Sequence, residues 1–452
     1  MEQEQEQRSA GTKEGFYKGW RIVIISGLFH AMFGGFYHTG LSVYFLPLIR
    51  SFGVSRTQMS FAFSVRSLEG GVEGPIAGYL VDRIGPRIIV IAGVIIGAVG
   101  FILLGLTQSY LTFLLVFLGV LTIGFSMPFH GLMATINFWF RRRLGTAMSL
   151  ATTGSAIGGF LVTPLIAWIV LNHSWQAAAI ISGVTLLVVG IPLALMVRMP
   201  QGDEAAAEEH GGSRNSGGHE GGGIATHASG HAGGANGPRF DGEFMVKEAL
   251  RTKAFWVLAL AIGLRLMAQS ALTVHFVPML VSRGVGEGTA AILVSVAAFV
   301  RLPAVIVGGL VADKWSRSKA SAVAMVLGIA AAVYITFGPS GLLTAIIFAI
   351  LFAGAESCNT VTWALVGEFF GRRNFATLRG IVTLVQSVMS FLGPIVAGFV
   401  YDTTQSYRIA FIAIALTYVL AAMLYWVMRA PAPPQRAGAP VAPAAQVQSP
   451  TN

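Results

Sequence analysis

Charged side chains inside apolar stretches are the residues of this chain best placed to do chemistry. Arg265, Arg301 and Glu356 each lie near the middle of a long apolar segment in the second half. A charge at bilayer depth costs several kcal/mol, so such a side chain usually faces a cavity or a partner. An unpaired arginine there suits a carboxylate, because its planar guanidinium donates two parallel hydrogen bonds. We expect Arg265 and Glu356 to pair, which leaves Arg301 to bind an anion.

A second charged group lies in the first half. Arg66, Glu69 and Glu73 are spaced i, i+3, i+7 and therefore share one helix face. Glu69 precedes Asp82 by about as many residues as Arg301 precedes Asp313, which predicts a similar depth. Desolvation favours the neutral acid, so Glu69 or Glu73 could carry a proton. The alternative is a local Arg66–Glu69 pair that only locks the helix.

Uncharged polar and aromatic side chains in other apolar segments are candidates for the wall of a binding cavity. A lone helical histidine is more often a hydrogen-bonded packing residue than a ligand. The candidates are Tyr37, His38, His130, Asn359, Trp363 and Gln386.

The composition indicates that lipid surrounds these segments. Hydrophobic residues make up 54% of the chain and charged residues only 11%, whereas a soluble domain has about a quarter charged residues. Apolar stretches of roughly 20 residues recur, each long enough to cross the bilayer core. We predict twelve, at 20–48, 55–81, 87–106, 110–140, 144–170, 175–197, 252–280, 288–312, 320–337, 342–369, 376–401 and 407–428.

The basic residues predict an orientation for these helices. Lys and Arg gather in the loops after the second, fourth, eighth and tenth segments, whereas the opposite loops hold only Arg50, Arg56, Arg283 and Arg408. Positive loops stay cytoplasmic, so we expect both termini and the central linker inside. The net charge of +10 then follows from topology and does not indicate a nucleic-acid partner.

The chain repeats itself weakly at a constant offset, which we call the repeat offset and which carries Asp82 onto Asp313. Gly78-Tyr79-Leu80-Val81-Asp82-Arg83 returns as Gly309-Leu310-Val311-Ala312-Asp313-Lys314. Two related halves in a membrane protein point to a transporter. We therefore predict an all-α membrane protein with two pseudo-symmetric six-helix bundles. The bundles cover 20–198 and 251–429, with tails at 1–19 and 430–452 and a mostly disordered linker at 199–250.

The loop after the second segment reads Gly78-x-Leu80-x-Asp82-Arg83-x-Gly85-x-Arg87. It resembles the signature of the major facilitator superfamily, and Gly309, Asp313 and Lys314 belong to a degenerate copy after the eighth segment. The resemblance implies that these residues form a gate between two helices and do not touch substrate. Within the superfamily, Gly19-Trp20-Arg21, the run from Asn137 to Arg143 and Arg301 resemble the oxalate/formate antiporter and monocarboxylate transporter group.

We expect a secondary active transporter for a small organic anion, most simply a monocarboxylate, driven by proton symport or anion exchange. The alternative is proton-coupled efflux of a drug-like or amphipathic metabolite, with Glu69, Glu73 or Glu356 as the acid. A ligand sensor is a third hypothesis. We expect no enzyme, cofactor or metal, because no phosphate-binding loop or metal-ligand spacing is found. The predicted protein is a single multi-pass chain of the inner or plasma membrane.

Overall fold

The computed structural model describes residues 19–140, 144–200, 244–371 and 374–431. The side chains of Glu69, Glu73, Asp82 and Asp313 lie outside what the structure describes, as do most of the predicted tails and most of the predicted linker. Within the described residues the chain is helical, and no strand occurs. The all-α prediction is therefore confirmed.

The helices of the first half follow the predicted segments closely. The first helix runs over residues 19–32, continues as the π-helix η1 (Phe33–His38) and resumes after Gly40. The remaining elements are α2 (Leu41–Phe52), α3 (Arg56–Ile84), α4 (Pro86–Leu106), α5 (Tyr110–Leu114), η2 (Leu115–Leu121), α6 (Thr122–Trp139), α7 (Leu144–Asn172), α8 (Trp175–Thr185), η3 (Leu186–Gly190) and α9 (Ile191–Leu195).

The second half begins with a short helix, α11 (Val246–Arg251), which lies within the predicted linker. The long helices then follow in the predicted order. They are α12 (Lys253–Val274), α13 (Phe276–Ser282), α14 (Glu287–Lys314), α15 (Arg317–Phe337), α16 (Leu342–Ala355), the 3₁₀ turn η5 (Glu356–Cys358), α17 (Asn359–Phe370), α18 (Phe375–Thr404) and α19 (Arg408–Val427).

The repeat offset is visible in the helix bounds. The offset that carries Asp82 onto Asp313 also carries the first residue of α3 onto the first residue of α14. It carries both ends of α4 onto both ends of α15, and the start of α7 onto the start of α18. The weak sequence repeat therefore marks a repeat of structure.

One of the twelve predicted membrane helices is less apolar than the others. Eleven helices among the described residues are long and hydrophobic enough to span a bilayer, and α3 is not one of them. α3 is nevertheless 29 residues long and packs against α18 and α6 inside the bundle. Its low hydropathy follows from Arg66, Glu69 and Glu73, the charged stripe identified in the sequence. These charges make α3 the helix most suited to line a polar space.

The local sequence explains how α3 begins and ends. The Ser55 hydroxyl accepts the backbone N–H of Gln58 at 3.2 Å, and the Gln58 side chain accepts the Ser55 N–H at 2.9 Å, which is a capping box. Gly85 ends the helix with φ +92°, a conformation that glycine adopts without strain. α4 can therefore start at once on Pro86.

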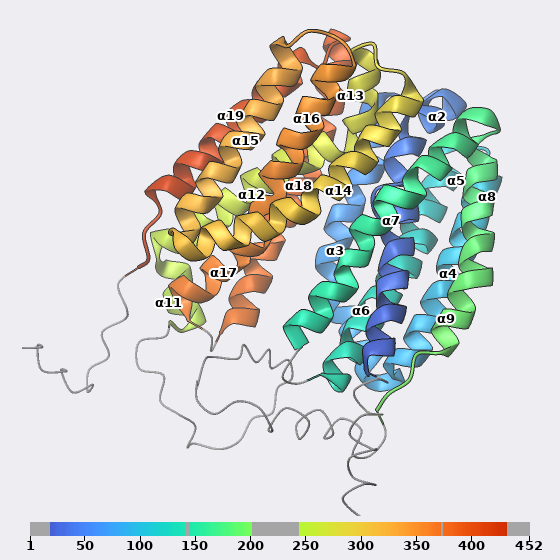
Figure 1. Ribbon diagram of the computed structural model, residues 1–452, viewed down its shortest axis with the longest axis horizontal. Coiled ribbons are helices and arrows are strands. Elements are labelled where there is room, and N and C mark those ends of the chain that lie inside the picture. Colours follow the sequence, from blue (N-terminus) through green and yellow to red (C-terminus); the bar gives the residue numbers. More distant parts are fainter. Residues whose placement is uncertain (1–18, 141–143, 201–243, 372–373, 432–452) are drawn as a thin grey trace, which may run out of the picture.

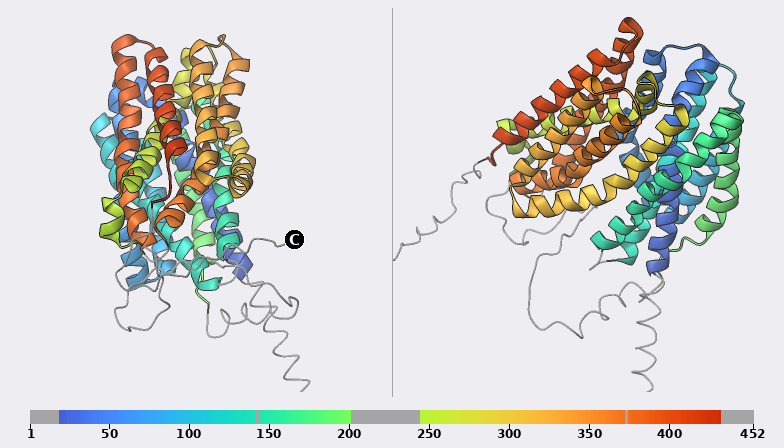
Figure 2. Two further views of the ribbon diagram at one scale, coloured as in Figure 1. Left: turned by 90° about the vertical axis from the view of Figure 1, so that its left-hand side faces the viewer. Right: turned by 45° about the horizontal axis from the view of Figure 1, so that its top comes forward.

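The two halves stand side by side, with the first half in blue to green and the second in yellow to red (Figure 1). α3 packs against α18 and α7 against α14. We call the side where α2 ends and α14 begins the closed side, and the side where α9 ends and α11 begins the linker side. On the linker side the ends of α6 and α17 stand well apart (Figures 1 and 2).

Small residues allow the first and fifth membrane helices to touch. A methyl group on Gly158 would collide with the Ala31 carbonyl, and one on Gly154 with the Gly27 carbonyl. Close backbone approach at small residues is a common way to pack helices in lipid. Gly398 plays the same part between the halves, because its hydrogens face the Arg56 carbonyl and the Ser60 hydroxyl. α3 and α18 therefore meet closely near the closed side.

Candidate functional site

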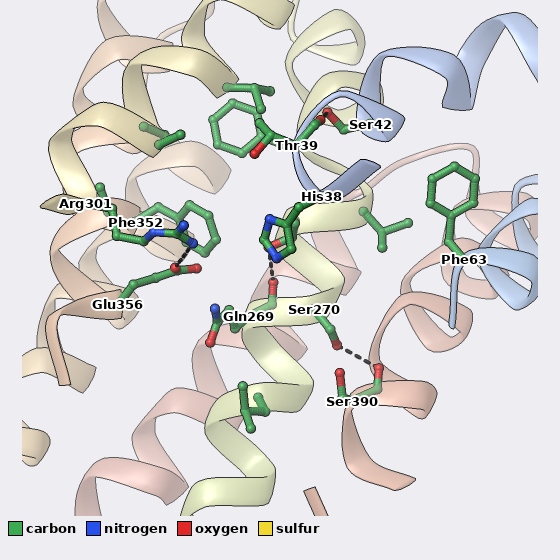
Figure 3. Close-up of a pocket in the computed structure, with 18 of the residues that line it drawn as sticks. His38, Thr39, Ser42, Phe63, Gln269, Ser270, Arg301, Phe352, Glu356 and Ser390 are labelled. Atoms are coloured by element: carbon green, nitrogen blue, oxygen red, sulfur yellow. Dashed lines mark hydrogen bonds and ion pairs between the residues drawn. The ribbon is translucent and has the colours of Figure 1, made fainter. Parts of the chain in front are cut away.

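A cavity of about 240 Å³ lies between the two halves, near the middle of the helices that form it. Side chains from both halves line it, and most of the surface is apolar. The lining includes Phe63, Leu266, Val274, Phe276, Val294 and Phe352, of which Phe63 and Phe352 are labelled in Figure 3. The charged lining residues within the described part of the chain are Arg66, Arg301 and Glu356.

The second half contributes an ion pair to this cavity. Nη1 of Arg301 on α14 lies 3.0 Å from Oε2 of Glu356, and the two side chains are 28% and 8% exposed. Glu356 begins the 3₁₀ turn η5, which interrupts the tenth membrane helix between α16 and α17. A mid-helix 3₁₀ turn re-aims its side chains and often marks a functional site. Here η5 packs on α14 and turns Glu356 toward Arg301 (Figure 3).

This pairing corrects the expected Arg265–Glu356 salt bridge. Arg265 is 1% exposed and donates to Gln269 Oε1 and to Asn359 Oδ1, both at 3.1 Å. Arg265 therefore bonds two side-chain amide oxygens, whereas the Glu356 carboxylate bonds Arg301. Sequence spacing placed all three charges at one depth, but it did not show that the helix breaks at Glu356. Arg301 consequently has a counter-charge, contrary to the prediction that it would be left unpaired.

The first half contributes a second cation. The Arg66 guanidinium lies 4.8 Å from the centre of the Tyr37 ring and donates to the Tyr37 carbonyl at 3.3 Å. The Tyr37 ring is stacked on Phe125 at 4.7 Å, and its hydroxyl donates to Thr122 at 3.2 Å. These contacts fix the direction of Arg66 without neutralising its charge. His38, from the end of η1, faces the same cavity (Figure 3).

Hydroxyl and amide side chains of the cavity wall were not predicted from the sequence. Gln269, Ser270 and Ser390 line it, and the Ser270 hydroxyl donates to the Ser390 carbonyl at 2.8 Å (Figure 3). Thr39, Ser42, Ser67 and Thr273 complete this set. Serine and threonine are common in membrane helices because their hydroxyls can bond a carbonyl one turn earlier. Their presence alone therefore gave no signal of a cavity.

Several predicted wall residues lie outside the described cavity lining. His130 bonds the Ser126 carbonyl at 3.0 Å, and Trp363 lies under the Arg379 guanidinium at 4.7 Å. Gln386 has a buried Oε1 without a hydrogen-bond partner among the described residues. Tyr37 lies behind Arg66, and Arg265 and Asn359 bond each other. Of the predicted substrate-binding residues, Arg301 and His38 line the cavity.

Two arginines of the predicted gate motif have structural partners near the linker side. Arg87 donates to the Leu195 carbonyl at 3.1 Å, which ties α4 to the end of α9. Arg83 donates to the Tyr79 hydroxyl at 2.8 Å, and Lys314 is exposed. Gly309 has open space around its α-carbon. Gly78, Asp82 and Asp313 belong to the same motif, but their surroundings lie outside the described part.

Polar contacts close the space between the halves on the opposite side. The Asp402 carboxylate of α18 accepts the Thr57 N–H at 2.8 Å, the Thr57 hydroxyl at 2.6 Å and the Arg56 N–H at 3.1 Å. The Arg56 guanidinium lies 3.5 Å from the centre of the Tyr401 ring. Arg50 also pairs with Glu287 across the halves. We call this set of contacts around Asp402 and Glu287 the closed-side contacts.

Membrane-spanning helices in two related halves, with a charged cavity between them, define a transporter of the alternating-access type. The chain matches the family description "Major Facilitator Superfamily" over residues 23–389 and again over residues 258–449. This protein belongs to the major facilitator superfamily. It is therefore a multi-pass integral membrane transporter and not an enzyme.

The relatives and a solved structure agree with this assignment. The chain is 23% identical to monocarboxylate transporter 12 of Mus musculus over 91% of this chain and 86% of that protein. It is 26% identical to the oxalate:formate antiporter of Oxalobacter formigenes, covering 89% of each. A bacterial homologue of the human lysosomal transporter Spinster, in an inward-facing and unoccupied conformation, aligns with a TM-score of 0.66 at 18% identity, over 92% of this chain and 96% of that one.

Proposed function

We propose that this protein carries a small organic anion, most simply a monocarboxylate, through the cavity between its halves. The supporting observation is the charge of the cavity. Its described lining holds two guanidinium groups, Arg66 and Arg301, against one carboxylate, Glu356. A cavity with excess positive charge and mostly apolar walls favours a solute that is anionic at one end and apolar at the other. The similarity to monocarboxylate transporters and to an oxalate:formate antiporter supports the same substrate class.

Arg301 is the residue that we propose to hold the carboxylate. One of its terminal nitrogens bonds Glu356, and 28% of the side chain is exposed. A guanidinium has five N–H donors, so one contact to Glu356 leaves donors for a second oxyanion. His38 and Gln269 lie in the same cavity and can orient the rest of the solute.

Transport would follow from rocking of the two halves about this cavity. The described basic residues where α3 meets α4 and where α14 meets α15 lie on the linker side, so we assign this side and both termini to the cytoplasm. With the closed-side contacts made, the described conformation would face the cytoplasm. The bundles at 20–198 and 251–429 would move as units, and the Asp82 and Asp313 loops would close the linker side in the alternate state.

Energy would come from a co-transported proton or from exchange against a second anion. Glu356 belongs to the cavity wall and bonds Arg301, so an arriving carboxylate would compete with it for the guanidinium. Protonation of Glu356 would relieve this competition. Glu69 and Glu73 are the other candidates for a proton carrier, on the same helix as Arg66.

The test is uptake into proteoliposomes of labelled lactate, formate and oxalate by the wild type, Arg301→Ala and Arg301→Lys. We expect uptake of at least one acid, its loss in Arg301→Ala, and partial uptake in Arg301→Lys. Arg408→Gln is the matched control, since Arg408 is exposed on the closed side and lies outside this cavity. Uptake that survives both Arg301 changes would exclude Arg301 as the anchor. Export of a lipophilic cation without uptake of any acid would favour the drug-efflux alternative.

A second measurement separates the coupling modes. Uptake is compared with and without an imposed pH gradient, and with and without an acid loaded on the inside. Glu69→Gln, Glu73→Gln and Glu356→Gln are tested in each condition. Proton symport predicts that the gradient drives accumulation and that one of these changes abolishes its effect. Anion exchange predicts that uptake requires the internal acid and ignores the gradient.

A further inference from the structure

We infer that Arg66 is a second anion-contacting residue, so that the bound solute bridges the two halves of the protein. This inference rests on the proposed function, because it concerns the same cavity. It adds a contact on the first half to the Arg301 contact on the second half.

The first argument is position. Arg66 and Arg301 line one cavity but belong to opposite halves, on α3 and α14. Measured from the closed-side ends of these two helices, Arg66 lies about 15 Å and Arg301 about 21 Å along the axis, at the usual rise per residue. His38 lines the same cavity as both arginines. A solute held in this cavity is therefore exposed to cations from both halves.

The second argument is charge. Glu356, the described carboxylate of the cavity, is committed to Arg301. Arg66 forms no ion pair with any carboxylate side chain that the structure describes. It is half-buried beside the cavity, where an uncompensated charge is costly. An anionic solute would supply a counter-charge that none of the described side chains gives to Arg66.

The third argument is pre-organisation. The Tyr37 ring face and the Tyr37 carbonyl hold the Arg66 guanidinium from behind. Tyr37 is itself 4% exposed and fixed by Phe125 and Thr122. A cation held in place before binding loses little side-chain entropy when the anion arrives. A ring and a carbonyl can orient Arg66 while its charge stays available.

The consequence is a role for Arg66 in the conformational cycle. A solute bound only to the second half has no direct reason to favour any arrangement of the two halves. A solute that touches both halves favours the arrangement in which both contacts are made. Arg66 would thus couple occupancy to the movement of the bundles. The competing explanation is that Arg66 only stabilises α3.

The first experiment compares uptake kinetics of Arg66→Gln, Arg66→Lys and the Arg408→Gln control, using whichever of lactate, formate and oxalate the wild type carries. We expect Arg66→Gln to lower kcat/KM about tenfold or more, the size of one lost charge-assisted hydrogen bond. Arg66→Lys should recover part of it. If Arg66→Gln leaves KM and kcat within about twofold of wild type while Arg301→Ala abolishes uptake, this inference is overturned and the proposed function stands. If neither Arg66→Gln nor Arg301→Ala lowers uptake of the acid, this inference is overturned and Arg301 is excluded as the anchor, while the carried acid itself still identifies an anion transporter.

The second experiment separates substrate contact from a purely structural role. Cys358 is the single cysteine, so Arg66→Cys is made in a Cys358→Ser background that retains uptake. A positively charged thiosulfonate reagent should restore transport, a negatively charged one should not, and the transported acid should slow the modification. Restoration by both reagents, or modification that the acid does not slow, would show that Arg66 acts only on the helix.

Discussion

In the second half, Arg301 forms an ion pair with Glu356 from a neighbouring helix, whereas in the first half Arg66 contacts the ring and carbonyl of Tyr37. The helices that carry the two arginines, α14 and α3, are related by the repeat offset. The arginines themselves are not, since Gly70 is the residue that this offset carries onto Arg301. The repeat therefore preserves the positions of the helices, whereas the charged side chains and their contacts differ between the two halves.

The largest expected effect comes from breaking the ion pair of the second half. Glu356→Gln leaves Arg301 without its counter-charge and should lower the free energy of unfolding by about 2–3 kcal/mol, less than for a fully buried pair because Arg301 is partly exposed. Thermal unfolding in detergent measures this. The double change Arg301→Gln with Glu356→Gln should recover part of the loss, since no charge is then unpaired. Equal stability of all three proteins would show that the pair adds nothing to the stability of the bundle.

The glycine contacts offer a comparison of helix packing in the two halves. Gly158 on α7 faces the Ala31 carbonyl, and Gly393 on the related helix α18 faces the Met267 carbonyl. Alanine at either position should cost about 1–3 kcal/mol, because neither backbone can move without disturbing the bundle. Gly380→Ala on α18 is the matched control, since nothing lies within 4 Å of the added methyl group. A cost at Gly380 as large as at Gly158 would contradict the packing argument.

The change Asp402→Asn should weaken the contact between the two halves on the closed side. An amide keeps one acceptor oxygen where the carboxylate accepts three hydrogen bonds from Arg56 and Thr57. We expect the closed-side contacts to weaken by about 1–2 kcal/mol, which opens this side in more molecules. Spin labels at Leu111 and Leu343, exposed on the two halves, would report longer distances. An unchanged distance distribution would mean that Asp402 does not hold this side closed.

The smallest expected effect on stability belongs to the first-half arginine. Arg66→Gln loses a cation–π contact and one hydrogen bond to a carbonyl, which predicts a change of about 1 kcal/mol or less. The same unfolding measurement as for Glu356→Gln gives the comparison directly. A loss as large as that of Glu356→Gln would show that Arg66 is a structural element of α3.

The helix frame was predictable because long apolar segments and the repeat offset are properties of the sequence alone. The cavity was predictable only in part. The positions of Arg301 and Glu356 within their apolar segments predicted a similar depth in the membrane. The partner of Glu356, however, depends on the 3₁₀ turn η5, which no pattern in the sequence predicted. Trp363 and His130 show that residue type alone does not predict which side chains line the cavity. Their types suit a cavity wall, yet Trp363 lies against the Arg379 guanidinium of α18, and the His130 ring bonds the Ser126 carbonyl of its own helix.

The start of α3 has a consequence for how the protein is made. Two of its first backbone amides, at Arg56 and Thr57, are bonded by Asp402, which lies on the penultimate long helix of the chain. During synthesis, the first six membrane segments leave the ribosome long before Asp402 is added to the chain. During that interval water must hydrate these amides, and the helix start can fray. Completion of α3 is therefore one of the last steps of biogenesis, and a first half expressed alone would carry an unfinished helix.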